Sequence, residues 1–225
     1  MPTSQTPPTT PDDNNPIPPG RIDSTPINYL ALGDSYTIGE SVVENGRYPV
    51  QLQRTLEKKG YRFTNEVKII ATTGWTTQNL LDAMAAQLSD SARYDMVSLL
   101  IGVNNQFQGR DLEEYKSQFL TLLQKAIQLT GGRKERVFVI SIPDYGYTPF
   151  GHRTQASISP AIDKFNAANW YITDSAGVKY FDITPISRKG LDVPELVAGD
   201  GLHPSEIMYK QWVDLMLPGV EKLLQ

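Results

Sequence analysis

Short apolar runs alternate along the chain with segments in which apolar residues recur at helical spacing. Runs such as Met96–Ile101 are typical of strands that are covered on both faces. Strands that alternate with helices are joined by right-handed crossovers into a parallel sheet. The sequence therefore predicts an α/β fold, a three-layer α/β/α sandwich around a five-stranded parallel sheet, whose strands are Ile27–Leu32, Val67–Ala71, Met96–Ile101, Val137–Ile142 and Val178–Ile183.

The helical segments lie between these runs and after the last one. Thr76 or Thr77 is a plausible cap for the second of them, and Asp111 and Glu114 have the spacing of a capping box, with Asp in place of Ser or Thr. Gly131 and Gly132 are expected to end the helix that Asp111 begins. The predicted helices cover residues 48–60, 77–88, 112–130, 162–172 and 208–220.

The first 26 residues differ in composition from the rest of the chain. Half of the 16 prolines lie there, among threonine, aspartate and asparagine. Such a stretch cannot bury enough apolar area to become ordered by itself. We therefore predict a disordered or polyproline-like tail over residues 1–26 and a single domain over residues 27–225.

The composition of the tail also indicates in which cellular compartment the protein acts. It lacks the basic start and the apolar run of about 7–15 residues that a signal peptide needs. No stretch of the chain reaches the roughly 18 apolar residues of a membrane-spanning helix. We expect the tail to be a spacer left after an export signal was removed, which predicts a periplasmic, secreted or envelope-tethered protein. The frayed terminus of a cytoplasmic protein is the alternative.

Composition excludes several classes of function. The chain has no cysteine, which excludes thiolate nucleophiles, zinc ribbons and iron–sulfur sites, and its two histidines are too few for a multi-histidine metal site. The net charge of −4 provides no basic footprint for nucleic acid. The zincin, nucleophile-elbow, Ser-x-x-Lys and P-loop motifs are absent. We expect a site that needs neither a metal nor a cofactor, and no nucleic-acid partner.

Polar residues and glycines follow each predicted strand. In a parallel sheet the carboxyl ends of the strands meet at one edge, where ligands bind. Ser35 lies between the first strand and the next helix, where its hydroxyl faces a helix N-terminus that favours negative charge. A serine hydroxyl needs a base to act as a nucleophile. Taken alone, Asp34 and Ser35 are more often helix caps.

His203 is the best candidate for that base. It follows Asp200 by three residues in a loop that contains Gly201 and Pro204, so the carboxylate can bond one imidazole nitrogen and leave the other free to accept a proton. His152 is the rival base, but no carboxylate lies near it in the sequence.

Gly74 and Asn104 supply donors for a tetrahedral oxyanion. A glycine lets its backbone N–H approach closely, an asparagine side chain on a neighbouring strand end adds a second donor, and the Ser35 N–H adds a third. Each residue alone is common in turns. Together with Ser35 and His203, they favour an enzyme that transfers acyl groups.

These residues identify a family resemblance that runs from about Ile27 to the C-terminus. The chain resembles the SGNH (GDSL-type) hydrolases, whose marker residues match Ser35 in Gly33-Asp34-Ser35, Gly74, Asn104 and His203. The resemblance implies a flavodoxin-like fold, with Ser35 as nucleophile, His203 as base and Asp200 as its orienting carboxylate. It also implies an oxyanion hole formed by the Ser35 N–H, the Gly74 N–H and the Asn104 side chain. Asn105 departs from the family, in which an aspartate often follows the marker asparagine.

The implied reaction is serine-dependent hydrolysis of carboxylic esters, and the substrate is a small-molecule, carbohydrate or lipid ester. The absence of an inserted lid favours short-chain or acetyl-sugar esters. Aromatic residues on the loops after the third and fourth strands are candidates for the substrate pocket: Phe107, Tyr145, Tyr147 and Phe150. The alternatives are a lysophospholipase or thioesterase, a non-catalytic glycan- or lipid-binding module on the same fold, and a receiver domain with Asp34 as phospho-acceptor.

Overall fold

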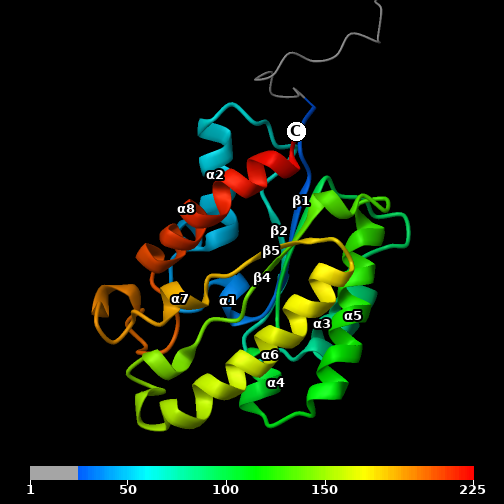
Figure 1. The fold of residues 1–225 in the computed structure, drawn as a ribbon. Helices are drawn as coiled ribbons and strands as arrows, with labels where there is room; N and C mark the ends of the chain where they lie inside the picture. Colours follow the sequence, from blue (N-terminus) through cyan, green and yellow to red (C-terminus); the bar gives the residue numbers. More distant parts are fainter. Residues whose placement is uncertain (1–24) are drawn as a thin grey trace, which may run out of the picture.

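Five parallel strands form one sheet in the order β2-β1-β3-β4-β5. The structure is a computed structural model that describes residues 25–225, so most of the predicted tail lies outside the described residues. The order and the direction of the strands confirm the predicted doubly wound α/β sandwich (Figure 1). The strands are β1 Tyr29–Gly33, β2 Lys68–Ala71, β3 Met96–Leu100, β4 Val137–Ile140 and β5 Lys179–Phe181.

The central strands are buried along their whole length. Every residue of β1 and of β3 is buried, and the two strands pair in register from Tyr29 opposite Met96 to Gly33 opposite Leu100. The outer strands β2 and β5 each begin with an exposed lysine, Lys68 and Lys179. The apolar runs thus located every strand, although β1 begins later than expected because Ile27 makes only an isolated bridge, to Phe63.

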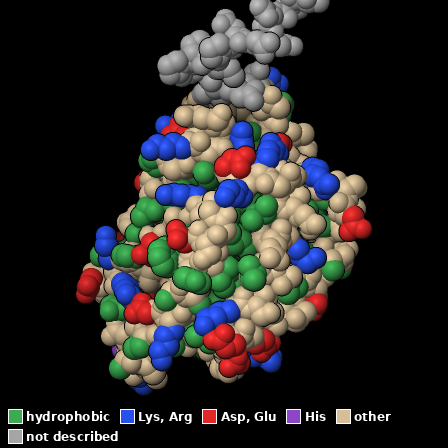
Figure 2. Space-filling model, turned by 45° about the vertical axis from the view of Figure 1, so that its right-hand side comes forward, with side chains coloured by type: hydrophobic (Ala, Val, Ile, Leu, Met, Phe, Trp, Pro, Cys, Tyr) green, Lys and Arg blue, Asp and Glu red, His purple; other side chains and the backbone are tan. Residues whose placement is uncertain are grey.

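Helices cover both faces of the sheet. Figure 1 shows α2 (Tyr48–Lys58) and α8 (Glu206–Leu223) on one face and α3 (Thr77–Gln87), α5 (Leu112–Leu129) and α6 (Gln155–Ser175) on the other. In Figure 2, basic and acidic side chains are interspersed with hydrophobic ones on the face that the picture presents. All five helices were predicted, but α6 begins at Gln155, well before the expected Ile162.

The expected capping box at Asp111 is only half formed. Asp111 accepts hydrogen bonds from the backbone N–H groups of Glu113 and Glu114, at 2.9 and 3.0 Å. The Glu114 carboxylate accepts from Gln118 at 2.9 Å. The reciprocal box lies instead at the start of α3, between Thr76 and Asn79.

Short helices and 3₁₀ turns follow several of the strands. They include α1 (Ser35–Ile38), α4 (Val103–Phe107) and α7 (Thr184–Ser187), and the turns Tyr145–Tyr147, His152–Thr154 and Pro194–Leu196. Apart from the helix start expected at Asp34 and Ser35, the sequence did not predict them, because elements of three to five residues are too short to show a helical period. The remaining turns are Glu44–Gly46 and Lys134–Arg136.

The turn from β1 into α1 leaves no room for a side chain at Gly33. A Cβ there would overlap the Thr37 Oγ1 and the carbonyl oxygen of Leu100 on β3. Asp34 follows as the N-cap of α1, and its side chain accepts a hydrogen bond from the Tyr36 N–H at 3.0 Å. These two residues place Ser35 at the first position of α1, directly above the sheet.

Asp34 is completely buried, and its environment changes its acidity. Burial raises the pKa of its carboxyl to about 7, although the backbone N–H groups of Tyr36 and Gly102 act in the opposite direction. The native protein thus holds a proton on Asp34 that the unfolded chain releases near its ordinary pKa of 3.8.

This difference predicts how stability changes with pH. Because the native state binds more protons, the contribution of Asp34 to the free energy of unfolding is present below pH 3.8 and is lost as pH rises to about 7. Asp34→Asn has no proton to lose, so its stability relative to wild type should rise by a few kcal/mol between pH 4 and pH 7, at about 1.4 kcal/mol per pH unit. Urea unfolding across this range measures the difference. Asp90→Asn, which changes an exposed carboxylate, is the control, and parallel curves for Asp34→Asn and wild type would contradict the prediction.

Candidate active site

The four marker residues meet at one small cavity at the carboxyl edge of the sheet. The cavity has a volume of about 130 Å³ and lies beyond β1, β2 and β3 and beside the loop that precedes α8. Sequence-distant residues therefore share one wall, as the parallel topology requires. The lining residues are Ser35, Tyr36, Thr73, Gly74, Val103, Asn104, Phe107, Tyr145, Phe150, Leu202 and His203.

Ser35 is held by the first turn of α1. Its carbonyl accepts hydrogen bonds from the N–H groups of Gly39 and Glu40, both at 3.0 Å. Its own N–H belongs to the first turn, where backbone donors have no partner within the helix. The side chain is only 4% exposed, yet it lines the cavity. Ser35 therefore presents a hydroxyl and a backbone donor at the same position.

His203 and Asp200 form a close pair beside Ser35. The His203 Nδ1 lies 2.6 Å from the Asp200 Oδ2, and the Tyr36 ring packs edge-on against the imidazole with its centroid at 5.7 Å. When Nδ1–H donates to the carboxylate, Nε2 carries no proton and can act as a base. The imidazole is thus held in the tautomer that a base needs.

Asp200 is stabilised as an anion by four donors. Oδ1 accepts from the backbone N–H groups of Leu202 and His203, both at 2.9 Å, and Oδ2 accepts from the Ser41 hydroxyl at 2.6 Å as well as from His203. Burial alone would raise the pKa of Asp200, but these hydrogen bonds outweigh it and hold the pKa well below the ordinary value. The carboxylate therefore stays charged beside the imidazole.

Gly74 and Asn104 lie on the same cavity wall, where they are candidates for further donors. Gly74 has φ +85°, a conformation that L side chains rarely adopt, although a Cβ there would meet no neighbouring atom. The backbone conformation, and not the available space, thus requires glycine. The Asn104 amide donates one hydrogen to the Trp75 carbonyl at 3.0 Å, which fixes its orientation and leaves its second N–H for a ligand.

Asn105, the departure from the family pattern, is buried behind this wall. Its Oδ1 accepts from the Thr77 N–H at 3.0 Å, and its Nδ2 donates to the Thr77 Oγ1 at 2.8 Å. The Thr77 hydroxyl in turn bonds the Gln118 side chain. Asn105 thus connects α4 to the start of α3. Because the Thr77 hydroxyl donates its proton to Gln118, it accepts a hydrogen bond from Asn105, which the amide N–H can provide.

Three of the four predicted pocket aromatics line the cavity. Phe107, Tyr145 and Phe150 have ring centroids 6.0–6.4 Å apart, and Phe107 and Phe150 are 58% and 56% exposed. The structure places Tyr147 elsewhere, with the Arg188 guanidinium 5.9 Å from its ring. Each of the four lining residues that the sequence missed is adjacent to a predicted site residue: Tyr36, Thr73, Val103 and Leu202.

Two rival assignments do not fit this geometry. His152 is exposed on a 3₁₀ turn, its Nδ1 is 2.8 Å from the Pro149 carbonyl, and it does not line the cavity. Asp34 is completely buried, so a phosphate donor could not reach it as a receiver domain requires.

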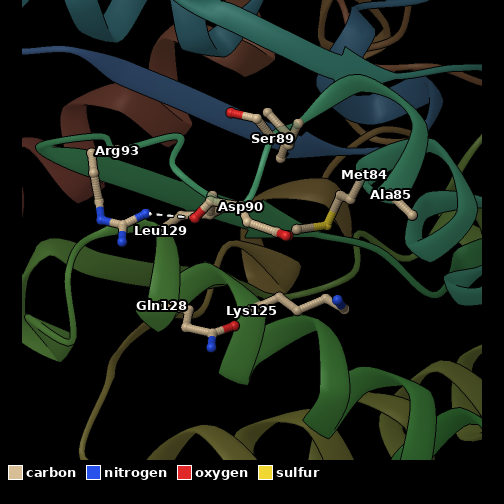
Figure 3. Close-up of a pocket in the computed structure, with 9 residues that line it drawn as sticks. Met84, Ala85, Ser89, Asp90, Arg93, Lys125, Gln128 and Leu129 are labelled. Carbon is tan, nitrogen blue, oxygen red and sulfur yellow. Dashed lines mark hydrogen bonds between the residues drawn. The ribbon is translucent and has the colours of Figure 1, made fainter.

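Four other hollows among residues 25–225 contain no histidine. Figure 3 shows the pocket of about 350 Å³ between the ends of α3 and α5, which contains Ser89, Arg93 and Lys125 but no histidine. Over residues 25–225, no three His, Cys, Asp or Glu side chains gather as metal ligands. No helix in this range is long and apolar enough to cross a membrane.

Solved structures with this architecture include several esterases. The chain is similar to TesA, with 18% identity and a TM-score of 0.68 over 87% of this chain and 99% of that one. It is similar to the acetyl xylan esterase AlAXEase, with 19% identity and a TM-score of 0.69 over 86% and 100% of the two chains. A lipase/acylhydrolase from Enterococcus faecalis shows 20% identity and a TM-score of 0.64 over 87% and 96%. At such low identities, these similarities establish the fold.

The family assignment comes from the sequence itself. No curated protein matches the chain. Residues 31–211, from β1 into α8, match the GDSL-like lipase/acylhydrolase family, and this range includes Ser35, Gly74, Asn104 and His203. The chain therefore belongs to the GDSL-like lipase/acylhydrolase family and is a hydrolase.

Proposed function

We propose that this hydrolase cleaves short-chain carboxylic esters, with acetylated sugars as the preferred class, through an acyl-enzyme on Ser35. The observation that carries the proposal is the His203–Asp200 pair, with 2.6 Å between Nδ1 and Oδ2, at the wall of the cavity that Ser35 also lines. A serine and an oriented neutral imidazole are the two groups that acyl transfer needs.

In the first half of the reaction, the Ser35 Oγ attacks the ester carbonyl carbon while the His203 Nε2 takes the hydroxyl proton. The charge that develops on the carbonyl oxygen is stabilised by the N–H groups of Ser35 and Gly74 and by the Asn104 amide. The C–O bond to the alcohol then breaks, and His203 returns the proton to the leaving oxygen.

In the second half, water replaces the alcohol. His203 takes a proton from the water, whose oxygen attacks the acyl carbon, and the Ser35 oxygen leaves with the proton that the imidazole returns. Asp200 stays ionised throughout, because its four donors stabilise the anion, and it stabilises the imidazolium that forms twice per turnover.

The size of the cavity supports a small acyl group. Sites that enclose drug-sized ligands measure about 300–1,000 Å³, whereas this cavity measures about 130 Å³. The exposed Phe107 and Phe150 rings lie at its mouth, where the apolar face of a sugar ring can pack against them. The similarity in fold to an acetyl xylan esterase also supports this class. Longer acyl chains, as in lysophospholipids or thioesters, are the alternative.

The assignment of nucleophile and base is tested by three variants. Ser35→Ala and His203→Ala should each lower kcat for nitrophenyl acetate by at least about a thousandfold, because the two groups act as a unit. His152→Ala, at the other histidine of the chain, should retain wild-type kcat. Circular dichroism checks that each variant is folded. Undiminished hydrolysis by Ser35→Ala would rule out the acyl-enzyme mechanism and favour a binding module.

The oxyanion assignment predicts a loss in kcat without a loss in binding. Asn104→Ala removes a donor that acts on charge present only in the transition state, so kcat should fall by about 10²–10³ while KM changes little. Steady-state kinetics with nitrophenyl acetate measures both. A raised KM with an unchanged kcat would instead assign Asn104 to ground-state binding.

The substrate class is tested by acyl length and by the leaving group. We expect kcat/KM for the nitrophenyl acetate ester to exceed that for the octanoate by at least about tenfold, because each extra methylene has no room in the cavity. Phe150→Ala should reduce kcat/KM for acetylated xylo-oligosaccharides several-fold more than for nitrophenyl acetate. Tyr171→Ala, at an exposed aromatic on α6 that does not line the cavity, is the control. A preference for octanoate would support the long-chain alternative.

A further inference from the structure

Ser41 makes an unexpected contact with the carboxylate beside His203. Its hydroxyl donates to the Asp200 Oδ2 at 2.6 Å, across 159 residues of sequence. The same oxygen lies 2.6 Å from the His203 Nδ1. Because Asp200 is ionised, both groups donate to it, and one oxygen is held between a hydroxyl and an imidazole N–H.

The backbone at Ser41 is unusual as well. With φ +64°, Ser41 is the one non-glycine residue with a positive φ among residues 25–225. A side chain in this region is strained, and a glycine would adopt the same conformation freely. Residues held in such conformations gather at functional sites. The strain directs the hydroxyl of Ser41 at Asp200, a bond that glycine could not make.

The segment that carries Ser41 also connects the walls of the site. It follows α1 directly, and the Glu40 N–H donates to the Ser35 carbonyl at 3.0 Å. The Glu40 carboxylate accepts from the Thr73 hydroxyl, next to Gly74. The few residues after Ser35 thus contact both the loop of Asp200 and the loop of Gly74, which come from distant parts of the chain.

We propose that Ser41 is a positioning residue for the Asp200–His203 pair, an inference that rests on the proposed esterase function. Its hydroxyl keeps the Asp200 Oδ2 directed at the imidazole and withdraws part of the negative charge from that oxygen. Ser41 does not line the cavity, and its hydroxyl reaches the site through the Asp200 carboxylate. It acts by keeping Nε2 of His203 directed toward Ser35 and by limiting how strongly the carboxylate stabilises the protonated imidazole.

The test compares two variants that differ in backbone strain. Ser41→Gly removes the hydroxyl and relieves the strain, whereas Ser41→Ala removes the hydroxyl and keeps the strain. We expect both to lower kcat for nitrophenyl acetate by about tenfold with KM within about twofold of wild type, while Ser41→Gly raises the Tm or leaves it unchanged. Ser91→Ala is the control and should match wild type. It removes an exposed hydroxyl whose Oγ lies 3.2 Å from the Ser89 Oγ.

The pH profile separates positioning from a general loss of structure. Without the Ser41 hydroxyl, the carboxylate stabilises the protonated base more strongly, so the acid limb of kcat/KM should move up by about half a pH unit. The other titratable side chains that line this cavity are Tyr36 and Tyr145. Asp34 and Asp144 act electrostatically on Tyr36, the Glu40 carboxylate accepts from the Thr73 hydroxyl, and neither variant removes any of these groups.

Each outcome decides the proposal. Wild-type kcat in Ser41→Gly, or a loss confined to Ser41→Ala, would assign Ser41 a backbone role only and overturn it. A lower kcat with an unmoved acid limb would indicate a general structural loss and would overturn it too. If Ser35→Ala retains activity, the esterase mechanism itself fails. If Ser35→Ala is inactive but Ser41→Gly has wild-type kcat, only the role of Ser41 is overturned.

Discussion

The close contact between the ends of β1 and β3 determines where the chemistry of this protein can occur. Gly33 and Leu100 are paired in register, and the space between Gly33, the Leu100 carbonyl and Thr37 admits no Cβ. The chain can therefore turn into α1 immediately at the end of β1. Ser35 begins that helix, and the loops after β2 and β3 end beside it. The serine thus rests on the most deeply buried part of the sheet, while its hydroxyl stays at the edge.

Two aspartates near this turn show how position decides acidity. Asp34 is fully buried, and burial outweighs its few backbone donors, so its pKa rises to about 7. Asp200 is less buried, with its side chain 29% exposed, and four donors hold its pKa below the ordinary value. Asp34 is therefore only partly charged near neutral pH, whereas Asp200 stays an anion beside the imidazole. The protein therefore separates the two roles by solvation and by hydrogen bonding.

The sequence predicted the sheet because buried parallel strands are apolar for their whole length. It predicted Ser35, Gly74, Asn104 and His203 as one group because a parallel sheet brings all its carboxyl ends to the same edge. It indicated a helix start at Ser35 but predicted neither the extent of α1 nor the presence of α4, because both are shorter than the window that reveals a helical period. Tyr147 shows a second limit of prediction from the sequence. The direction of an aromatic side chain on a loop depends on its tertiary partner, here Arg188, and not on how close it lies in sequence to a strand end.

Ser41 shows a third limit, and it is the most informative. A serine six residues after the nucleophile carries no sequence signal, because neither its positive φ nor its partner 159 residues away can be read from local pattern. The groups that react are specified by short motifs, but the groups that hold them in place are specified by long-range contacts. Since the loops of Asp200 and Gly74 both bond the segment after α1, a change in that segment reaches both of these loops together. In the proposed mechanism, the segment from Ser35 to Ser41 therefore keeps the nucleophile at a fixed spacing from the residues that support its partners.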